Sequence, residues 1–162
     1  MTIIEDVHLT PAAVSHHPAF RIDTITLTWD ERRRGHGRRR SDSGLEFAIS
    51  LPSGTVLKAG DCFVLVPDNA IVAVREAAEP VYVIQPKTPQ EWAYYAYQVG
   101  NRHQTVMIEE SELVFLQNPA VRSLLDQLHV PYTAGQSPFT RALDNIGSSH
   151  ELRRINLFIR YR

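Results

Sequence analysis

The hydrophobic periodicity of this sequence changes once, near residues 76–79, and that change constrains the fold more than any other feature. Ahead of it, apolar and polar residues alternate, as in residues 22–29 and 45–51, which is the two-residue period of a strand with one buried face. Beyond it, apolar residues recur at the spacing of a helix face. We therefore expect an α+β fold with two small domains. The predicted boundaries are residues 1–77, residues 78–144 and a tail of residues 145–162.

The first domain is predicted to consist of short strands. Residues 62–66 and 71–74 are continuous runs of strand-forming residues, and Pro-Asp-Asn at residues 67–69 separates them. Turn-forming clusters occupy residues 52–54 and 59–61. Short strands at this spacing are typical of a small all-β sandwich or barrel.

The second domain carries two helix-start signals of the same kind. Thr88 and Asn118 are capping residues, and each is followed directly by a proline, which suits the first helical position. Apolar residues follow each signal at positions i, i+3, i+4 and i+7, so each set shares one helix face. These residues are Trp92, Tyr95, Ala96 and Val99 in the first helix, which Gly100 is placed to end, and Val121, Leu124, Leu125 and Leu128 in the second.

Strands are predicted on either side of both helices. Residues 81–84 precede the first helix, residues 105–108 and 112–116 lie between the helices, and residues 132–137 follow the second. The order is β-α-β-β-α-β, which is the plan of a ferredoxin-like domain.

Composition and motifs exclude several classes of protein. The formal net charge is −1, so bulk charge does not indicate a polyanion-binding protein. The single cysteine, Cys62, cannot form an internal disulfide, and we recognise no signal peptide or membrane-spanning stretch. We expect a cytoplasmic protein with no membrane partner. Since no motif for a catalytic nucleophile, a zinc hydrolase or a phosphate-binding loop is present, we expect no catalytic residues and no enzymatic activity.

His103 is the first candidate metal ligand. It closes a Gly-Asn-Arg-His motif at residues 100–103, directly after the first predicted helix. A neutral imidazole binds Ni²⁺, Cu²⁺ or Zn²⁺ well. One histidine makes a poor site, but a twofold dimer would place two copies of it at one point. The alternative, which spacing alone favours, is a histidine that stabilises the C-terminus of a helix.

His150 is the second candidate ligand. It follows Gly-Ser-Ser at residues 147–149, a flexible start to the tail, and a mobile histidine can close a metal site or hand a metal on. The alternative is a solvated loop histidine, which the sequence alone favours. The adjacent pair His16 and His17 is a weaker candidate, because neighbouring residues of an extended chain point to opposite sides.

A dense basic run at residues 32–40 is predicted to form a mobile loop between strands, because it contains two glycines. Two interpretations stay open, a docking patch for an acidic protein partner and a solvated hairpin loop. Nucleic acid ranks third, because aromatic residues do not interleave with the basic ones. The candidate partner-binding residues are Arg32, Arg33, Arg34, Arg38, Arg39 and Arg40.

The chain resembles the urease accessory protein E (UreE) family in four stretches, which together span most of residues 20–140 in the order of the family. One is the Gly-Asn-Arg-His motif with the residues before it, and another is a Leu-Pro-x-Gly-Thr-x-Leu-x-x-Gly-Asp run. The stretches are residues 27–34, 51–61, 96–103 and 135–139.

The resemblance implies an N-terminal β domain that binds peptides or docks on urease, and a ferredoxin-like C-terminal domain that binds metal and forms a homodimer. It implies that His103 binds Ni²⁺ at the dimer interface. It also implies delivery of Ni²⁺ to the urease apoprotein and its maturation complex, with the GTPase UreG as immediate partner.

The sequence departs from the family in its tail. Many members end in a histidine-rich segment, whereas this chain has only His150 there. We therefore expect about one metal ion per dimer, held by two copies of His103, with His150 as a candidate third ligand. Zn²⁺ and Cu²⁺ are expected to compete with Ni²⁺, because imidazoles do not select strongly among these metals. The alternative function is a protein-interaction module that docks a client through its β domain and arginine run, with metal incidental.

Overall fold

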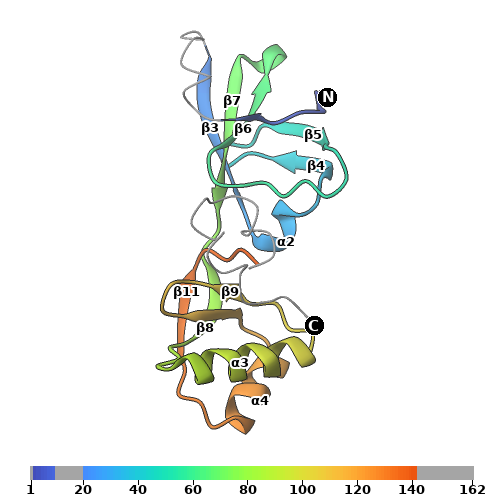
Figure 1. Cartoon of the computed structure of the whole chain (residues 1–162). Coiled ribbons are helices and arrows are strands. Elements are labelled where there is room, and N and C mark those ends of the chain that lie inside the picture. The colour runs from blue at the N-terminus through green and yellow to red at the C-terminus, as the bar shows by residue number, and fades with distance from the viewer. Residues whose placement is uncertain (1, 10–19, 142–162) are drawn as a thin grey trace. The chain divides into compact units, whose positions relative to one another are not determined.

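The computed structural model describes residues 2–9 and 20–141 of the chain (Figure 1). It divides into two compact units, Met1–Ala77 and Ala78–Arg162. Each unit has its own hydrophobic core. The predicted tail, residues 145–162, lies outside the described residues.

The N-terminal unit contains a three-stranded sheet of order β1-β5-β4 and a four-stranded sheet of order β2-β6-β7-β3, which confirms the predicted β-sandwich. Strand β5 pairs in parallel with β1 and antiparallel with β4, whereas β7 pairs antiparallel with β6 and in parallel with β3. The elements are β1 (Ile3–Ile4), β2 (His8–Leu9), β3 (Arg21–Leu27), α2 (Trp29–Arg32), β4 (His36–Arg40), β5 (Glu46–Ser50), β6 (Asp61–Leu65), the 3-10 turn η1 (Val66–Asp68) and β7 (Ala70–Glu76).

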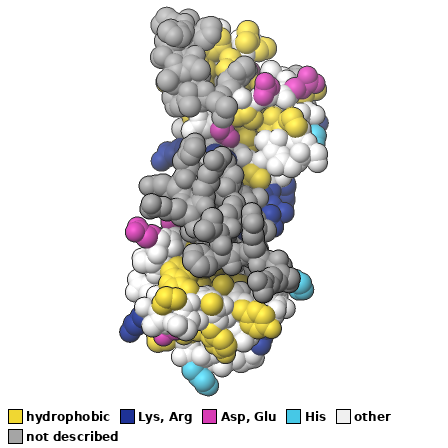
Figure 2. All heavy atoms as spheres, viewed as in Figure 1, with side chains coloured by type: hydrophobic (Ala, Val, Ile, Leu, Met, Phe, Trp, Pro, Cys, Tyr) yellow, Lys and Arg dark blue, Asp and Glu magenta, His cyan; other side chains and the backbone are white. Residues whose placement is uncertain are grey.

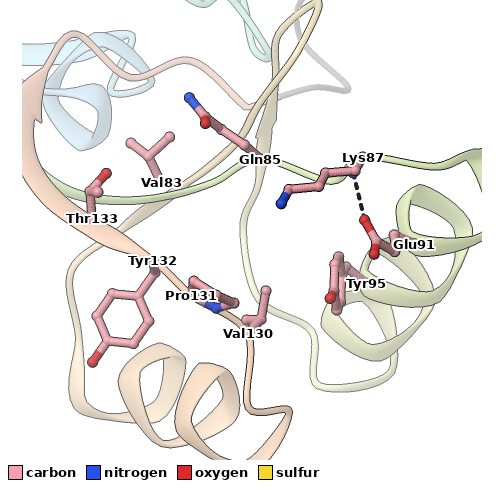
Figure 3. A pocket seen from close by; sticks show the side chains of 9 residues that line it. All are labelled: Val83, Gln85, Lys87, Glu91, Tyr95, Val130, Pro131, Tyr132 and Thr133. Atoms are coloured by element: carbon pink, nitrogen blue, oxygen red, sulfur yellow. Dashed lines mark hydrogen bonds between the residues drawn. The ribbon is translucent and has the colours of Figure 1, made fainter.

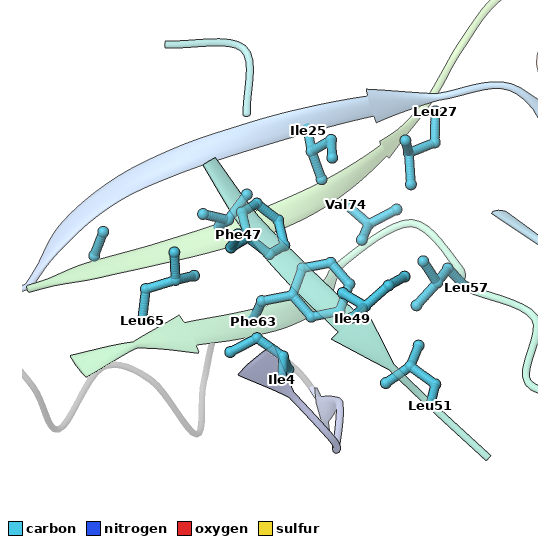
Figure 4. Close-up of a cluster of buried hydrophobic side chains, with 12 residues drawn as sticks. Ile4, Ile25, Leu27, Phe47, Ile49, Leu51, Leu57, Phe63, Leu65 and Val74 are labelled. Atoms are coloured by element: carbon cyan, nitrogen blue, oxygen red, sulfur yellow. The ribbon is translucent and has the colours of Figure 1, made fainter. Parts of the chain in front are cut away.

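Alternation along the strands builds the core of this unit (Figure 4). In β5, Phe47 and Ile49 are buried, while Glu46 and Ser50 are exposed. The Phe47 ring meets the ring of Phe63 from the other sheet, with the two centroids 5.5 Å apart and the planes at 52°. Burying a ring of this size contributes about 1.5–3 kcal/mol, so this pair is a main link between the two sheets.

The segment before β4 differs from the prediction. The sequence pattern predicts a strand through Trp29 and then a mobile loop, but the structure has helix α2 followed by strand β4. The cause is a capping box. The Glu31 N–H donates to Thr28 Oγ1 over 3.4 Å, and the Thr28 N–H donates to the Glu31 carboxylate over 2.9 Å. These two bonds start a helical turn directly after β3.

Arg32 has a role different from the one its sequence context predicts. Its side chain is 1% exposed, and its Nη1 donates to the Glu76 carboxylate over 2.8 Å and to the Leu57 carbonyl over 3.3 Å. The guanidinium also lies 5.3 Å from the centroid of the Trp29 ring. The expectation that Arg32 binds a partner is therefore wrong, because its charged group joins α2 to β7 inside the fold.

The C-terminal unit has the predicted β-α-β-β-α-β order and is ferredoxin-like. Its sheet has the order β11-β8-β10-β9, with every neighbouring pair antiparallel. Both helices cover one face of this sheet (Figure 1), where a separate core forms. The elements are β8 (Glu79–Ile84), α3 (Pro89–Asn101), β9 (Met107–Ile108), β10 (Leu113–Leu116), α4 (Pro119–Gln127) and β11 (Thr133–Ser137).

Both predicted helix caps are present. The Glu91 N–H donates to Thr88 Oγ1 over 3.1 Å, and the Val121 N–H donates to Asn118 Oδ1 over 2.8 Å. Each bond satisfies a backbone donor that the first helical turn leaves without a carbonyl partner. The starts of α3 and α4 were therefore predictable to the residue.

Removing the buried guanidinium should destabilise the N-terminal unit. We expect Arg32→Ala to lower the free energy of unfolding by about 2–4 kcal/mol, since the Glu76 carboxylate and the Leu57 carbonyl lose their partner and a cavity forms beside Trp29. Urea unfolding measures the change. The control is Arg34→Ala at an exposed position, which should shift stability by less than about 0.5 kcal/mol. Equal effects of the two substitutions would contradict the role given to Arg32.

Candidate metal site

His103 lies immediately beyond helix α3, in a left-handed backbone conformation with φ of 52°. Its N–H donates to the Gly100 carbonyl over 3.0 Å, and the Gln104 N–H donates to the Val99 carbonyl over 3.3 Å. This pair of bonds is a Schellman motif, the common way in which a helix ends. The helix runs through Gly100 to Asn101, so the prediction that Gly100 ends it is wrong.

The turn that carries His103 is held against the second helix. The Arg102 guanidinium donates to Gln127 Oε1 over 2.8 Å, and the Arg102 carbonyl accepts from Gln104 Nε2 over 3.1 Å. The His103 side chain is exposed. Across residues 2–9 and 20–141 the structure gives its ring no hydrogen-bond or ion-pair partner. Both ring nitrogens are therefore accessible to a ligand from outside the chain.

His129 occupies the same position at the end of α4. It also has φ of 52°, and its N–H donates to the Asp126 carbonyl over 3.1 Å. Hence a left-handed histidine after a helix does not by itself identify a metal ligand. A residue with a Cβ atom loses about 1–2 kcal/mol in this conformation relative to glycine. His129 therefore serves as a matched control for substitutions at His103, because both are histidines in the same backbone conformation.

Helix α3 has a second apolar face, which points away from the core. Tyr94 and Tyr97 are 50% and 65% exposed, and the helix contains a single charged residue, Glu91. Figure 2 shows hydrophobic side chains gathered on the part of the C-terminal unit where α3 runs in Figure 1. This exposed face ends at the turn that carries His103.

Sequence reasoning missed this outer face, although a signal for it exists. Ala93, Ala96, Tyr97 and Gly100 also recur at i, i+3, i+4 and i+7, and all are exposed. Ala96, which the spacing groups with Trp92, Tyr95 and Val99, is exposed. The short helix contains two sets of apolar residues at helical spacing. Counting only the first set leaves the second, exposed set unnoticed.

The other described candidates do not join His103. Within the described ranges, no group of three or more His, Cys, Asp or Glu side chains is close enough to hold a metal ion. Histidine side chains lie apart on the face of the C-terminal unit shown in Figure 2. Cys62 is a buried thiol whose Sγ donates to the Gly60 carbonyl, and burial raises its pKa, with the Asp61 charge adding to the effect. A thiol kept protonated is a poor metal ligand. His16, His17 and His150 lie outside the described residues.

A pocket of about 410 Å³ lies beside the first half of α3 (Figure 3). Lys87, Glu91 and Tyr95 line one side of it, and the Lys87 backbone N–H donates to the Glu91 carboxylate over 2.5 Å. Burial raises the pKa of Tyr95, and the Glu91 charge raises it further. The pocket is lined by no histidine or cysteine. It does not extend the site at His103, which lies beyond the opposite end of the helix.

The arginines of the basic run, residues 32–40, differ in how far they are exposed to solvent. Arg33, Arg34, Arg38 and Arg40 are exposed, Arg39 is half-buried, and Arg32 is buried. None of the described helices is long and apolar enough to cross a membrane.

Replacing His103 by glycine should stabilise the chain. We expect His103→Gly to raise the free energy of unfolding by about 0.5–1 kcal/mol, because glycine adopts positive φ without a Cβ clash. Urea unfolding followed by circular dichroism measures the change, and His129→Gly should behave alike. A loss of stability in His103→Gly alone would show that the imidazole makes a contact within the fold.

Comparisons with known proteins match both units of the chain to one family. Residues 2–76 match the family described as the UreE urease accessory protein, N-terminal domain, and residues 79–153 match its C-terminal domain. The urease accessory protein UreE of Chelativorans sp. (strain BNC1) is 33% identical over 118 residues, which cover 73% of this chain and 74% of that protein. The UreE of Lysinibacillus sphaericus is 29% identical over 148 residues, covering 91% and 99% of the two chains. The UreE of Burkholderia vietnamiensis is 31% identical over 149 residues, covering 92% and 72%.

Proposed function

Since the chain belongs to the UreE family of urease accessory proteins, we propose that it is a homodimeric metallochaperone that carries Ni²⁺ to the urease maturation complex. The family description is that of an accessory protein and not of an enzyme. The proposed metal ligands are two copies of His103, one from each protomer. The observation that carries the proposal is that the helix with the exposed apolar face, α3, leads directly into the turn that carries the exposed His103.

The outer face of α3 is suited to pack against its own copy. Tyr94 and Tyr97 supply apolar area, while Ala93, Ala96 and Gly100 leave room for a second helix to approach. Such an interface would be isologous, so each residue near the twofold axis meets its own copy. His103 stands at the end of this face, where the two copies can share one metal ion.

A site with two imidazole ligands supports delivery better than storage. Two ligands leave coordination positions open, so the ligands of a receiving protein can enter before those of the donor leave. His150, in the tail, is a candidate third ligand that would help to coordinate the ion until it is transferred. Each imidazole must be neutral to bind, so protons compete with the metal as the pH falls.

The receiving partners in this proposal are the GTPase UreG and the urease apoprotein complex, and the transfer takes place in the cytoplasm. Imidazole ligands favour Cu²⁺ over Ni²⁺ and also bind Zn²⁺. Selection of Ni²⁺ must therefore come largely from these partners and from metal supply.

The first test is calorimetric titration of the full chain with Ni²⁺. We expect the wild type to bind about one ion per two chains, and His103→Ala to lose this binding. The matched control, His129→Ala, changes the same residue type in the same backbone conformation and should bind as the wild type does. The affinity should fall as the pH is lowered, because protons compete with the metal ion for the imidazole nitrogens. Equal binding by the two variants would remove the central residue of the proposal.

A second test addresses the interface. We expect Tyr97→Glu to dissociate the dimer, because two copies of a desolvated carboxylate would face each other across the axis. Nickel binding should weaken by more than about tenfold, as each remaining protomer offers one ligand. Ala120→Glu adds the same charge at an exposed position on α4 and should leave both properties unchanged. Sedimentation equilibrium gives the mass, and a dimeric Tyr97→Glu variant would contradict this interface.

A second candidate function is a protein-interaction module in which metal binding is incidental. The exposed arginines of residues 33–40 favour it. It predicts partner binding that survives His103→Ala and fails when these arginines are neutralised.

A further inference from the structure

Strand β4 is the edge of its sheet, because β5 is its only strand partner among the described residues. The Leu51 N–H donates to the Gly35 carbonyl, and the Ser41 N–H donates to the Leu45 carbonyl. In an antiparallel pair these bonds recur at every second residue, so Gly37 and Arg39 also face β5. The backbone N–H groups of residues 36, 38 and 40 therefore point toward the open edge.

The side chains along this edge are strongly basic. Arg38 and Arg40 project to the face opposite the core, because Arg39 lies in register with the buried Phe47. No ion pair is formed by Arg38 or Arg40 within the described ranges, although Glu46 lies in register with Arg40. In the next positions across the sheet, Ala48 is opposite Arg38 and the exposed Ile3 is opposite Ala48.

Arg39 adds positive charge that the fold compensates poorly. Its guanidinium donates to the Arg34 carbonyl and to the Arg38 carbonyl over 3.0 Å, and its Nε is buried without a hydrogen-bond partner. Burial lowers the pKa of Arg39; Glu31 opposes that effect, while Arg34 lowers the pKa further. Negative charge brought to this edge would be favourable.

We propose that β4 is a docking edge for an extended acidic segment of a partner protein, which adds a strand to the sheet. Its backbone would accept hydrogen bonds from the N–H groups of residues 36, 38 and 40, which point toward the open edge. Residues of a strand that share a face are two positions apart, so the matching segment carries Asp or Glu at alternate positions facing Arg38 and Arg40. The proposal does not depend on nickel binding by His103.

Protection against aggregation and binding of nucleic acid both account less well for the basic edge. Charged side chains can protect an edge strand against aggregation, but that role requires no bound segment. Single-stranded nucleic acid is bound through base stacking on aromatic side chains, and β4 contains no Phe, Tyr or Trp. The free backbone donors at alternate residues match the groups of another strand.

The probe for the test is a fluorescein-labelled octapeptide of alternating glutamate and threonine, titrated with the full chain and followed by fluorescence anisotropy. The control peptide has the same composition, with glutamates and threonines alternating in pairs, so that no two glutamates are two positions apart. We expect the alternating peptide to bind about five- to tenfold more tightly, because only it places carboxylates in register with both arginines. Equal binding of the two peptides would overturn the proposal.

Matched variants separate the edge from general charge. Arg38→Gln/Arg40→Gln should weaken binding of the alternating peptide by about tenfold. Arg21→Gln/Arg75→Gln removes the same charge at exposed positions of the same unit and should change binding by less than about twofold. Equal losses in the two double variants would show diffuse attraction and overturn the proposal.

Amide hydrogen exchange tests the added strand itself. Adding the alternating peptide should protect the amides of His36, Arg38 and Arg40, while those of Gly37 and Arg39 are protected in the free chain. Peptide binding without new protection at the even-numbered residues would overturn strand addition. Tighter binding of an oligothymidylate than of the peptide would overturn the choice of partner.

Discussion

Helix α3 is apolar on two faces, and its own domain can bury only one of them. The inward face, with Trp92, Tyr95 and Val99, packs on the sheet as part of the C-terminal core. The outward face, with Tyr94 and Tyr97, is exposed in the single chain. An uncharged face of this kind is typical of an interaction surface. The proposed dimer and the proposed two-histidine site both depend on this one helix.

The end of the same helix determines where the candidate ligand stands. The last turn closes through backbone bonds from His103 and Gln104, so the imidazole takes no part in closing it. Arg102 ties the turn to Gln127 on α4. The candidate ligand is thus positioned by main-chain geometry and by its neighbour Arg102, and its ring stays exposed. His129 repeats the backbone geometry without the adjoining apolar face, which is why geometry alone does not identify a ligand.

In the N-terminal unit, one buried arginine determines what its neighbours can do. Arg32 is held by Glu76 and Leu57, and this anchors α2 against the sandwich. The chain then leaves the helix and forms an edge strand in which Arg38 and Arg40 are exposed and Arg39 is half-buried. The basic run of residues 32–40 therefore contains one buried structural cation, Arg32, and several exposed arginines.

Local signals predicted most of the fold, because they act over a few residues. Strand alternation and the caps at Thr88 and Asn118 are of this kind, and the structure reproduces them. The capping box of Thr28 and Glu31 is equally local, but it was hidden by a strand pattern that continues into Trp29. The candidate site was different: spacing alone favoured a structural role for His103, and only the family motif pointed to metal.

The sequence by itself determined the β-α-β-β-α-β order of the second domain, the helix starts and the motif that ends in His103, because each depends on neighbouring residues. Only the tertiary structure decided that Arg32 is buried, since its partner Glu76 is 44 residues away. It also decided that β4 is an edge strand and that one apolar face of α3 stays open, because strand order and helix packing depend on contacts between segments far apart in the chain.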